Sequence, residues 1–322
     1  MDQTAVVSES DCCGNGCANC VLDVGLPKST GEILTGKQNV IATYQKFRLF
    51  SKTRHNPKGT DIGNNSEDLS EVFELYFGVT DLITNSNDYV LAIPAGYHVM
   101  MRTYMSTGHV CLRPYSPFWV DGLAMEFKIL VNLTPGGYMS QYIKDLQVGD
   151  HVEFRGPIGS LEYISTEKER CVFIISQGVA IAATIRIVKN ILNDEEDLSR
   201  VYQVACYKDI EHTYFRYLLR DFNKYWNYES HIYLAHQKCS SDMCKTDECT
   251  GKCDWFLKKL WYKEKACLER FSEAHLVDIC AKVNSYSKFV FIIAGSKKFQ
   301  DFITEIVNKL NNEIKQSNIF LL

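Results

Sequence analysis

The sequence predicts a β-barrel domain followed by an α/β domain with a doubly wound parallel sheet. Its 322 residues suit two domains of about 150 residues each. The first half consists of short β-type runs separated by turn residues, which is typical of an antiparallel Greek-key barrel or a sandwich. In the second half, apolar strands alternate with helix-like stretches, which indicates a parallel sheet.

These patterns divide the chain into three segments. Residues 1–37 contain cysteines, glycines and a proline, and are expected to form an N-terminal tail. The barrel is predicted over residues 38–166 and the α/β domain over residues 167–322. Residues 238–270 interrupt the alternation of strands and helices in the second half, and we expect an insertion there between the third strand and the next helix.

Each element has its own local signal. The predicted barrel strands, rich in β-branched and aromatic residues, are 46–51, 72–79, 89–93, 109–112 and 125–131, with a closing strand near 154–159. The predicted α/β strands are 171–176, 201–206, 231–235, 289–294 and 318–322. The predicted helices are 178–192, 211–225, 273–283 and 299–314.

The composition excludes several classes of protein. Apolar residues make up 46% and charged residues 23%, which is ordinary globular usage and excludes disorder, collagen and coiled coil. The net charge of −4 gives no global basic field for nucleic acid. The apolar run 289–295 is far shorter than the roughly 20 residues of a membrane helix, so no transmembrane segment is expected. The N-terminus shows no secretory signal, so an intracellular location is expected, cytoplasmic by default with mitochondria as the alternative.

The cysteines are unevenly distributed. Of 13 cysteines, eight form two clusters: Cys12, Cys13, Cys17 and Cys20, and then Cys239, Cys244, Cys249 and Cys253. In a reducing compartment, clustered thiols point to metal or redox chemistry rather than to structural disulfides. The first cluster suits a zinc site, a redox relay or a docking tail. The second lacks Cys-x-x-Cys pairs, so a metal or iron–sulfur site and a loop with incidental thiols both stay open, and no metal ligand is assigned.

Four motifs of the barrel half bear chemistry. Arginine in Arg113-Pro114-Tyr115-Ser116-Pro117 can bind a phosphate through two donors, while tyrosine offers a flat ring and serine a hydroxyl. Lys128 follows in Glu126-Phe127-Lys128. The Gly136-Gly137 pair comes before a short predicted helix, where backbone N–H groups can close on a pyrophosphate. The fourth motif, 146–159, has the pattern of the barrel's closing strand.

In this order and spacing, the four motifs resemble the flavin domain of the ferredoxin–NADP reductase superfamily, in particular its NADH–cytochrome b5 reductase family. The resemblance covers roughly residues 44–322. It implies that Arg113 binds FAD phosphate, that Tyr115 packs on the flavin, and that Ser116 hydrogen-bonds the flavin near N5. Lys128 would lie near the cofactor and the nicotinamide, which makes Ser116 and Lys128 the implied catalytic residues. The implied FAD-binding set is Arg113, Pro114, Tyr115, Ser116, Lys128, Gly136, Gly137, Met139 and Ser140.

The nicotinamide half resembles the family less closely. The family's glycine-rich loop corresponds here to Gln177-Gly178-Val179-Ala180, so that alanine replaces a glycine at which the backbone approaches the dinucleotide. Its Cys-Gly-Pro motif corresponds to Ala294-Gly295-Ser296, which lacks the thiol. Gly178, Val179 and Gly295 remain the implied NADH-binding residues.

The implied function is that of an FAD-dependent oxidoreductase. Electrons would pass from NADH through flavin to a one-electron acceptor, a haem protein such as cytochrome b5. The first cysteine cluster resembles an oxidoreductase-like N-terminal segment of the reductase-like branch. Two alternatives remain: an FAD-binding scaffold or sensor with weak or no NADH activity, and a metal-binding protein that acts through its cysteine clusters.

Overall fold

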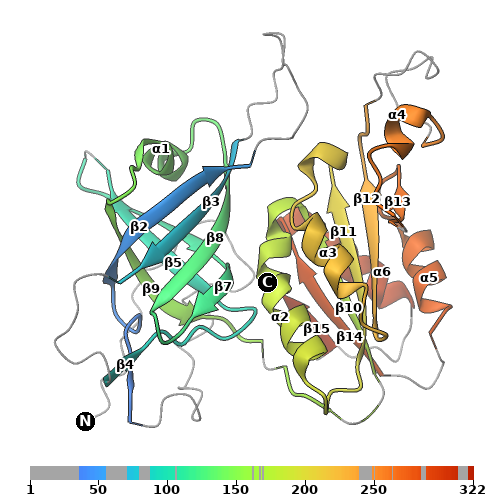
Figure 1. The fold of residues 1–322 in the computed structure, drawn as a ribbon, viewed down its shortest axis with the longest axis horizontal. Helices are drawn as coiled ribbons and strands as arrows, with labels where there is room; N and C mark the ends of the chain where they lie inside the picture. Colours follow the sequence, from blue (N-terminus) through green and yellow to red (C-terminus); the bar gives the residue numbers. More distant parts are fainter. Residues whose placement is uncertain are drawn as a thin grey trace. The chain divides into compact units, whose positions relative to one another are not determined.

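A computed structural model describes most of the chain from Gly36 onward, and most of its helices and strands are labelled in Figure 1. The described residues are 36–55, 71–79, 88–105, 107–161, 163–166, 168, 170–238, 249, 251–262, 264–283, 288–310 and 318–322. The first cysteine cluster and the N-terminal segment resemblance lie outside these ranges, as do Cys239 and Cys244. The chain divides into two compact units, one that ends before Tyr163 and one that begins there.

The first unit is an antiparallel barrel. Its strands are β2 (Gln45–Arg54), β3 (Glu71–Gly78), β5 (His98–Tyr104), β6 (Val110–Tyr115), β7 (Pro117–Asp121), β8 (Glu126–Leu133) and β9 (His151–Ile158). Their hydrogen-bonded order is β6-β5-β9-β2-β3-β8-β7. The two end strands, β6 and β7, are separated in sequence only by Ser116, so the sheet must curl round until its ends meet. This confirms the predicted barrel.

Four phenylalanines fill the centre of this barrel. Phe47, Phe77, Phe127 and Phe154 come from four different strands and are fully buried. The Phe127 ring centroid lies 5.1 Å from that of Phe47 and 5.0 Å from that of Phe154, both in edge-to-face geometry. Alternate residues of each strand therefore point inward, and the residues between them form the outer surface.

Helix α1 (Tyr138–Asp145) connects β8 to β9. Two short strands, β1 (Gln38–Asn39) and β4 (Tyr89–Val90), pair in parallel outside the main sheet. The strand predicted over 89–93 is therefore shorter than expected and does not belong to the barrel.

The second unit is a six-stranded parallel sheet with helices on both faces. Its elements are β10 (Arg170–Gln177), η3 (Gly178–Ile181), α2 (Ala182–Asn193), β11 (Arg200–Tyr207), η4 (Ile210–His212), α3 (Arg216–Phe222), β12 (Tyr228–Leu234), α4 (Asp254–Leu257), β13 (Ala266–Cys267), α5 (Glu273–Cys280), β14 (Lys288–Ala294), α6 (Lys297–Leu310) and β15 (Ile319–Leu321). The strand order is β13-β12-β11-β10-β14-β15. α5 and α6 pack on one face, and Figure 1 shows α2 and α3 on the other. Within the described ranges, no helix is long and apolar enough to cross a membrane.

Two predicted features of this unit need correction. The helix predicted over 211–225 is two pieces, η4 and α3, because Phe215 adopts a left-handed conformation with φ of 57° between them. The 238–270 segment does not only interrupt the domain. It contributes β13, which pairs in parallel with β12 and becomes an edge strand of the sheet.

The described part of this insertion is fastened to α3 and η4. Arg216 donates to both carboxylate oxygens of Glu264 and, across 2.6 Å, to the carbonyl oxygen of Lys259. Lys259 in turn forms an ion pair with Glu211. The Arg216 guanidinium also lies 4.3 Å from the ring centroid of Trp261. These half-buried contacts hold the insertion on the domain surface.

Candidate functional site

The barrel's two end strands meet at Ser116, which is half-buried between β6 and β7. Arg113 and Tyr115 share one face of β6, because alternate residues of a strand point to the same side. Arg113 is half-buried, and its Nη1 donates to the carbonyl oxygen of Leu112 across 2.7 Å, which leaves other guanidinium donors for a ligand. Burial raises the pKa of Tyr115, so this phenol stays protonated at neutral pH.

The glycine pair forms a tight turn at the start of α1. Gly136 has φ of +73°, and a Cβ built there would meet no atom within 4 Å. The N–H of Gly137 donates to the carbonyl oxygen of Thr134 across 3.1 Å. Ser140 accepts a hydrogen bond from the N–H of Thr134 at 2.9 Å, so its oxygen closes the turn. The first N–H groups of α1 have no partner within the helix, which favours an anion at this end.

The fold brings the arginine strand and the glycine turn together. α1 packs against both β6 and β8. The Tyr138 hydroxyl donates to the carbonyl oxygen of Tyr104 on β5 across 2.8 Å, and Met139 is buried beneath the helix. A guanidinium and a helix N-terminus therefore lie on neighbouring elements, with open space over Gly136. This arrangement fits the phosphates of a dinucleotide such as FAD.

Lys128 lies in a patch of acidic and aromatic residues on the barrel's outer surface. Its Nζ lies 3.1 Å from a carboxylate oxygen of Glu74, and 5.2 Å and 5.9 Å from the ring centroids of Tyr76 and Trp119. The pKa of Glu74 is lowered, chiefly by a hydrogen bond from His55 and then by Lys128. Lys128 thus already has a carboxylate partner, whereas the resemblance assigns it to the cofactor.

The strand register does not place Lys128 opposite Ser116. Pro117 lies opposite Ile129, and in this antiparallel ladder Ser116 and Lys128 lie on opposite sides of that pair. Trp119 lies opposite Lys128 after a bulge. Sequence reasoning did not identify Trp119 as part of this patch, although a tryptophan three residues after the motif serine was a usable signal.

In the second unit, the carboxyl ends of β10 and β14 are where the dinucleotide crevice of a doubly wound sheet is expected. Strand order reverses between these two strands, and open α/β sheets bind ligands outside the strand ends at such a point. Gly178 follows β10 directly with φ of +56°, and a Cβ there would meet no atom within 4 Å. Val179 and Ala180 are half-buried in η3. The space over Gly178 is therefore open to a dinucleotide.

A polar contact joins the two strand ends. The Ser296 hydroxyl donates to Oε1 of Gln177 across 2.9 Å. Gly295, between β14 and this serine, has no room for a side chain, because a Cβ would lie 2.6 Å from the ring of Phe299. Ala294, where the family has its cysteine, is fully buried. Sequence reasoning found Gly178 and Gly295 but not the bond between Gln177 and Ser296.

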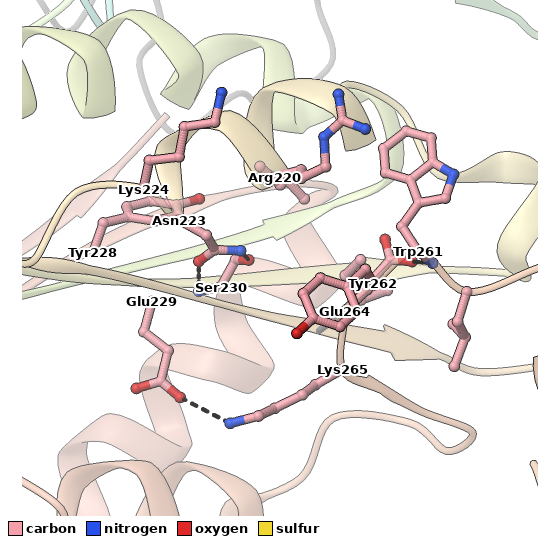
Figure 2. Close-up of a pocket in the computed structure, with 13 residues that line it drawn as sticks. Arg220, Asn223, Lys224, Tyr228, Glu229, Ser230, Trp261, Tyr262, Glu264 and Lys265 are labelled. Carbon is pink, nitrogen blue, oxygen red and sulfur yellow. Dashed lines mark hydrogen bonds and ion pairs between the residues drawn. The ribbon is translucent and has the colours of Figure 1, made fainter.

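The second unit also has a cavity of about 1140 Å³ beside the amino half of β12 (Figure 2). Tyr228, Glu229 and Ser230 line it from the strand, and Trp261 and Tyr262 line it from the insertion. The strands are parallel, so this cavity lies toward the opposite end of the sheet from Gly178. It belongs to the insertion rather than to the dinucleotide crevice.

Comparison with known proteins agrees with this geometry. Residues 77–163 match the family model of the oxidoreductase FAD-binding domain. The chain is 25% identical over 240 residues to a mouse protein named NADH-cytochrome b5 reductase-like, an alignment that covers 71% of this chain and 72% of that protein. The human protein of the same name is 24% identical over 245 residues and 73% of each chain.

Solved structures share the fold. The cytochrome b5 reductase domain of Ulva prolifera nitrate reductase superposes with a TM-score of 0.62 at 16% identity, covering 89% of this chain and all of that one. Ferredoxin-NADP+ reductase from Plasmodium falciparum superposes with a TM-score of 0.57 at 13% identity, covering 87% of this chain and 95% of that one. At these identities the structures establish the fold alone.

Proposed function

We propose that the chain is a cytochrome b5 reductase-like member of the ferredoxin–NADP reductase superfamily, and that it oxidises NADH and passes the electrons to a one-electron acceptor. FAD and NADH are the cofactors of this oxidoreductase type. FAD, when bound, supplies the chemistry of taking up two electrons and releasing them singly. The acceptor we propose is a haem protein of the cytochrome b5 kind, as the names of the relatives suggest.

The observation that carries this proposal is the pairing of the Arg113 strand with the glycine turn of α1. The guanidinium would neutralise a phosphate, and the first N–H groups of α1 would hold the adjoining one. Tyr115 would present a neutral phenol ring to the isoalloxazine, and Ser116 would donate or accept a hydrogen bond at its edge. The protein's part is to bind and orient the cofactor.

In the second unit, Gly178 would let the dinucleotide approach the backbone after β10. The bond from Ser296 to Gln177 would hold the two walls of the crevice at a fixed separation. A rigid crevice of this kind positions the nicotinamide without requiring a reactive side chain.

One observation supports a second candidate, an FAD-binding protein with little NADH turnover. Ala294 is fully buried where the family has a cysteine, and Ala180 stands where it has a glycine. These replacements weaken the nicotinamide half and leave the flavin half intact.

An absorbance spectrum of the purified full chain, before and after anaerobic NADH, tests the proposal. We expect a flavin spectrum that bleaches within seconds, and reoxidation when ferric cytochrome b5 is added. A flavin band that NADH does not bleach would support the second candidate. A chain that takes up no flavin when incubated with FAD would refute both.

A further inference from the structure

Two cysteines of the insertion lie in contact within the second unit. The Sγ atoms of Cys249 and Cys253 are 3.3 Å apart. The two residues are 8% and 2% exposed, and Cys253 immediately precedes α4. The second cysteine cluster of the sequence thus contains a preformed pair of thiols.

The two thiols are not equivalent. The N–H of Gly251 points at Cys249 Sγ across 3.5 Å, and Gly251 adopts the left-handed conformation that this tight loop requires, with φ of +77°. A hydrogen bond donated to sulfur favours the thiolate. The N–H of Cys249 also donates to the carbonyl oxygen of Gln237 across 3.0 Å, which fixes the start of the loop. Cys249 is also the more exposed of the two thiols, at 8% against 2%, and is therefore the one that a small disulfide reaches first.

The separation of the sulfurs bears on the chemistry. Two thiolates on one tetrahedral zinc ion lie about 3.8 Å apart when each Zn–S bond is about 2.3 Å. A disulfide needs about 2.05 Å. The pair, at 3.3 Å, is already closer than zinc ligands. Within the described ranges, no group of three or more His, Cys, Asp or Glu side chains could hold a metal ion.

We propose that Cys249 and Cys253 form a reversible dithiol–disulfide site whose oxidant is a low-molecular-weight disulfide of the glutathione type. Cys249 thiolate attacks one sulfur of this disulfide, which releases one thiolate and leaves a mixed disulfide on Cys249. Cys253, after losing its proton, then attacks Cys249 Sγ and releases the second thiolate. One small disulfide is reduced to two thiols, and the protein dithiol is oxidised by two electrons with loss of two hydrogens.

Trp255 can report the redox state of the two cysteines through its fluorescence. Trp255 lies two residues beyond Cys253 in α4, and the Lys259 ammonium is 4.0 Å from its ring centroid. Lys259 also pairs with Glu211 of η4. Closing the disulfide pulls on the first residue of α4, so the environment of Trp255 changes with the redox state of the pair.

The test is peptide-level mass spectrometry of the full chain equilibrated with reduced and oxidised glutathione. We expect the wild-type peptide that spans both cysteines to lose two hydrogens reversibly. In Cys253→Ser the mixed disulfide should be trapped on Cys249, with more adduct than Cys253 acquires in Cys249→Ser, because Cys249 is the more exposed thiol. Trp255 fluorescence should follow oxidation in the wild type and in neither variant.

Cys267→Ser is the matched control, because Cys267 is an exposed thiol in the same insertion and lies outside the pair. This variant should still form the Cys249–Cys253 disulfide. Equal adducts in the two single variants would refute the order of attack, and a wild-type peptide that keeps both hydrogens in excess oxidised glutathione would refute the proposal. So would a stoichiometric metal ion in the purified chain that is lost in Cys249→Ser and blocks oxidation, since the pair would then be metal ligands.

Discussion

Ser296 donates its hydroxyl hydrogen to Oε1 of Gln177, and this bond ties together two strand ends that are 119 residues apart in the sequence. Gln177 is the last residue of β10, and Ser296 comes shortly after the end of β14. The order of strands in the sheet reverses between β10 and β14. The same serine oxygen lies 3.4 Å from the N–H of Phe299 in the first turn of α6. One side chain therefore joins the two strand ends and caps a helix, which makes it a direct test of the proposed nicotinamide site.

We expect Ser296→Ala to raise KM for NADH roughly fivefold, because a lost hydrogen bond of about 1 kcal/mol would loosen the crevice. The rate at saturating NADH should change less. Steady-state kinetics with ferricyanide as acceptor measures both. Ser230→Ala on β12 is the control, because Ser230 lines the cavity near the opposite end of the sheet. An unchanged KM in Ser296→Ala would contradict the role of this bond.

The two glycines of the crevice should respond differently to alanine. Gly178→Ala places a methyl group in open space but forces a left-handed φ of +56°, at a cost of roughly 1 kcal/mol. Gly295→Ala drives a Cβ to within 2.6 Å of the Phe299 ring, so the ring or the helix that carries it must shift. Thermal unfolding should therefore show a larger loss of Tm for Gly295→Ala. Equal losses would mean that the crowding at Gly295 relaxes freely.

Arg113→Ala should weaken FAD binding ten- to hundredfold, because a charge-assisted contact with phosphate contributes roughly 1.5–3 kcal/mol. Arg113→Lys should recover only part of this, since lysine offers a point charge rather than a fork of donors. Flavin fluorescence during dialysis gives the dissociation constant. Arg54→Ala provides the control, because Arg54 is a more exposed arginine of the same unit that pairs with Glu71. Flavin retention that is equal in the two alanine variants would exclude Arg113 as the phosphate ligand.

Local patterns in the sequence were sufficient for most of the fold. The continuous apolar run of β10 is typical of a strand that is buried on both faces. The alternation of β3 and β8 is typical of strands that are buried on one face. β5 was not predicted, because His98 to Tyr104 contains Met100 and Met101 side by side and shows no alternation. Both methionines are nonetheless buried, since β5 lies inside the sheet between β6 and β9.

Contacts between distant residues could not be predicted in the same way. The motif order gave the positions of Arg113 and the glycine turn along the chain, but only the structure shows that the helix after the glycines packs against the strand that carries Arg113. The bond between Gln177 and Ser296 has no local signature, because the two residues belong to separate motifs that lie 119 residues apart in the sequence. β13 is only two residues long and lies within the predicted insertion, so its sequence gives no strand pattern. Its pairing with β12 is what identifies it as a strand.

The barrel also contains a histidine that should make stability depend on pH. Burial lowers the pKa of His98 on β5 from its ordinary value of 6.5 to about 4. The unfolded chain therefore binds the proton more readily than the folded chain between these two values, and stability falls as the pH is lowered through this window. The full effect on the free energy of unfolding is roughly 3 kcal/mol, and about 2 kcal/mol of it should be lost between pH 7 and pH 5.

We expect His98→Gln, which carries no titrating ring, to remove this part of the pH dependence when urea unfolding is compared at the two pH values. His109→Gln replaces an exposed histidine of the same unit and should leave the loss unchanged. If all three proteins lose the same free energy of unfolding, His98 is not held neutral by burial.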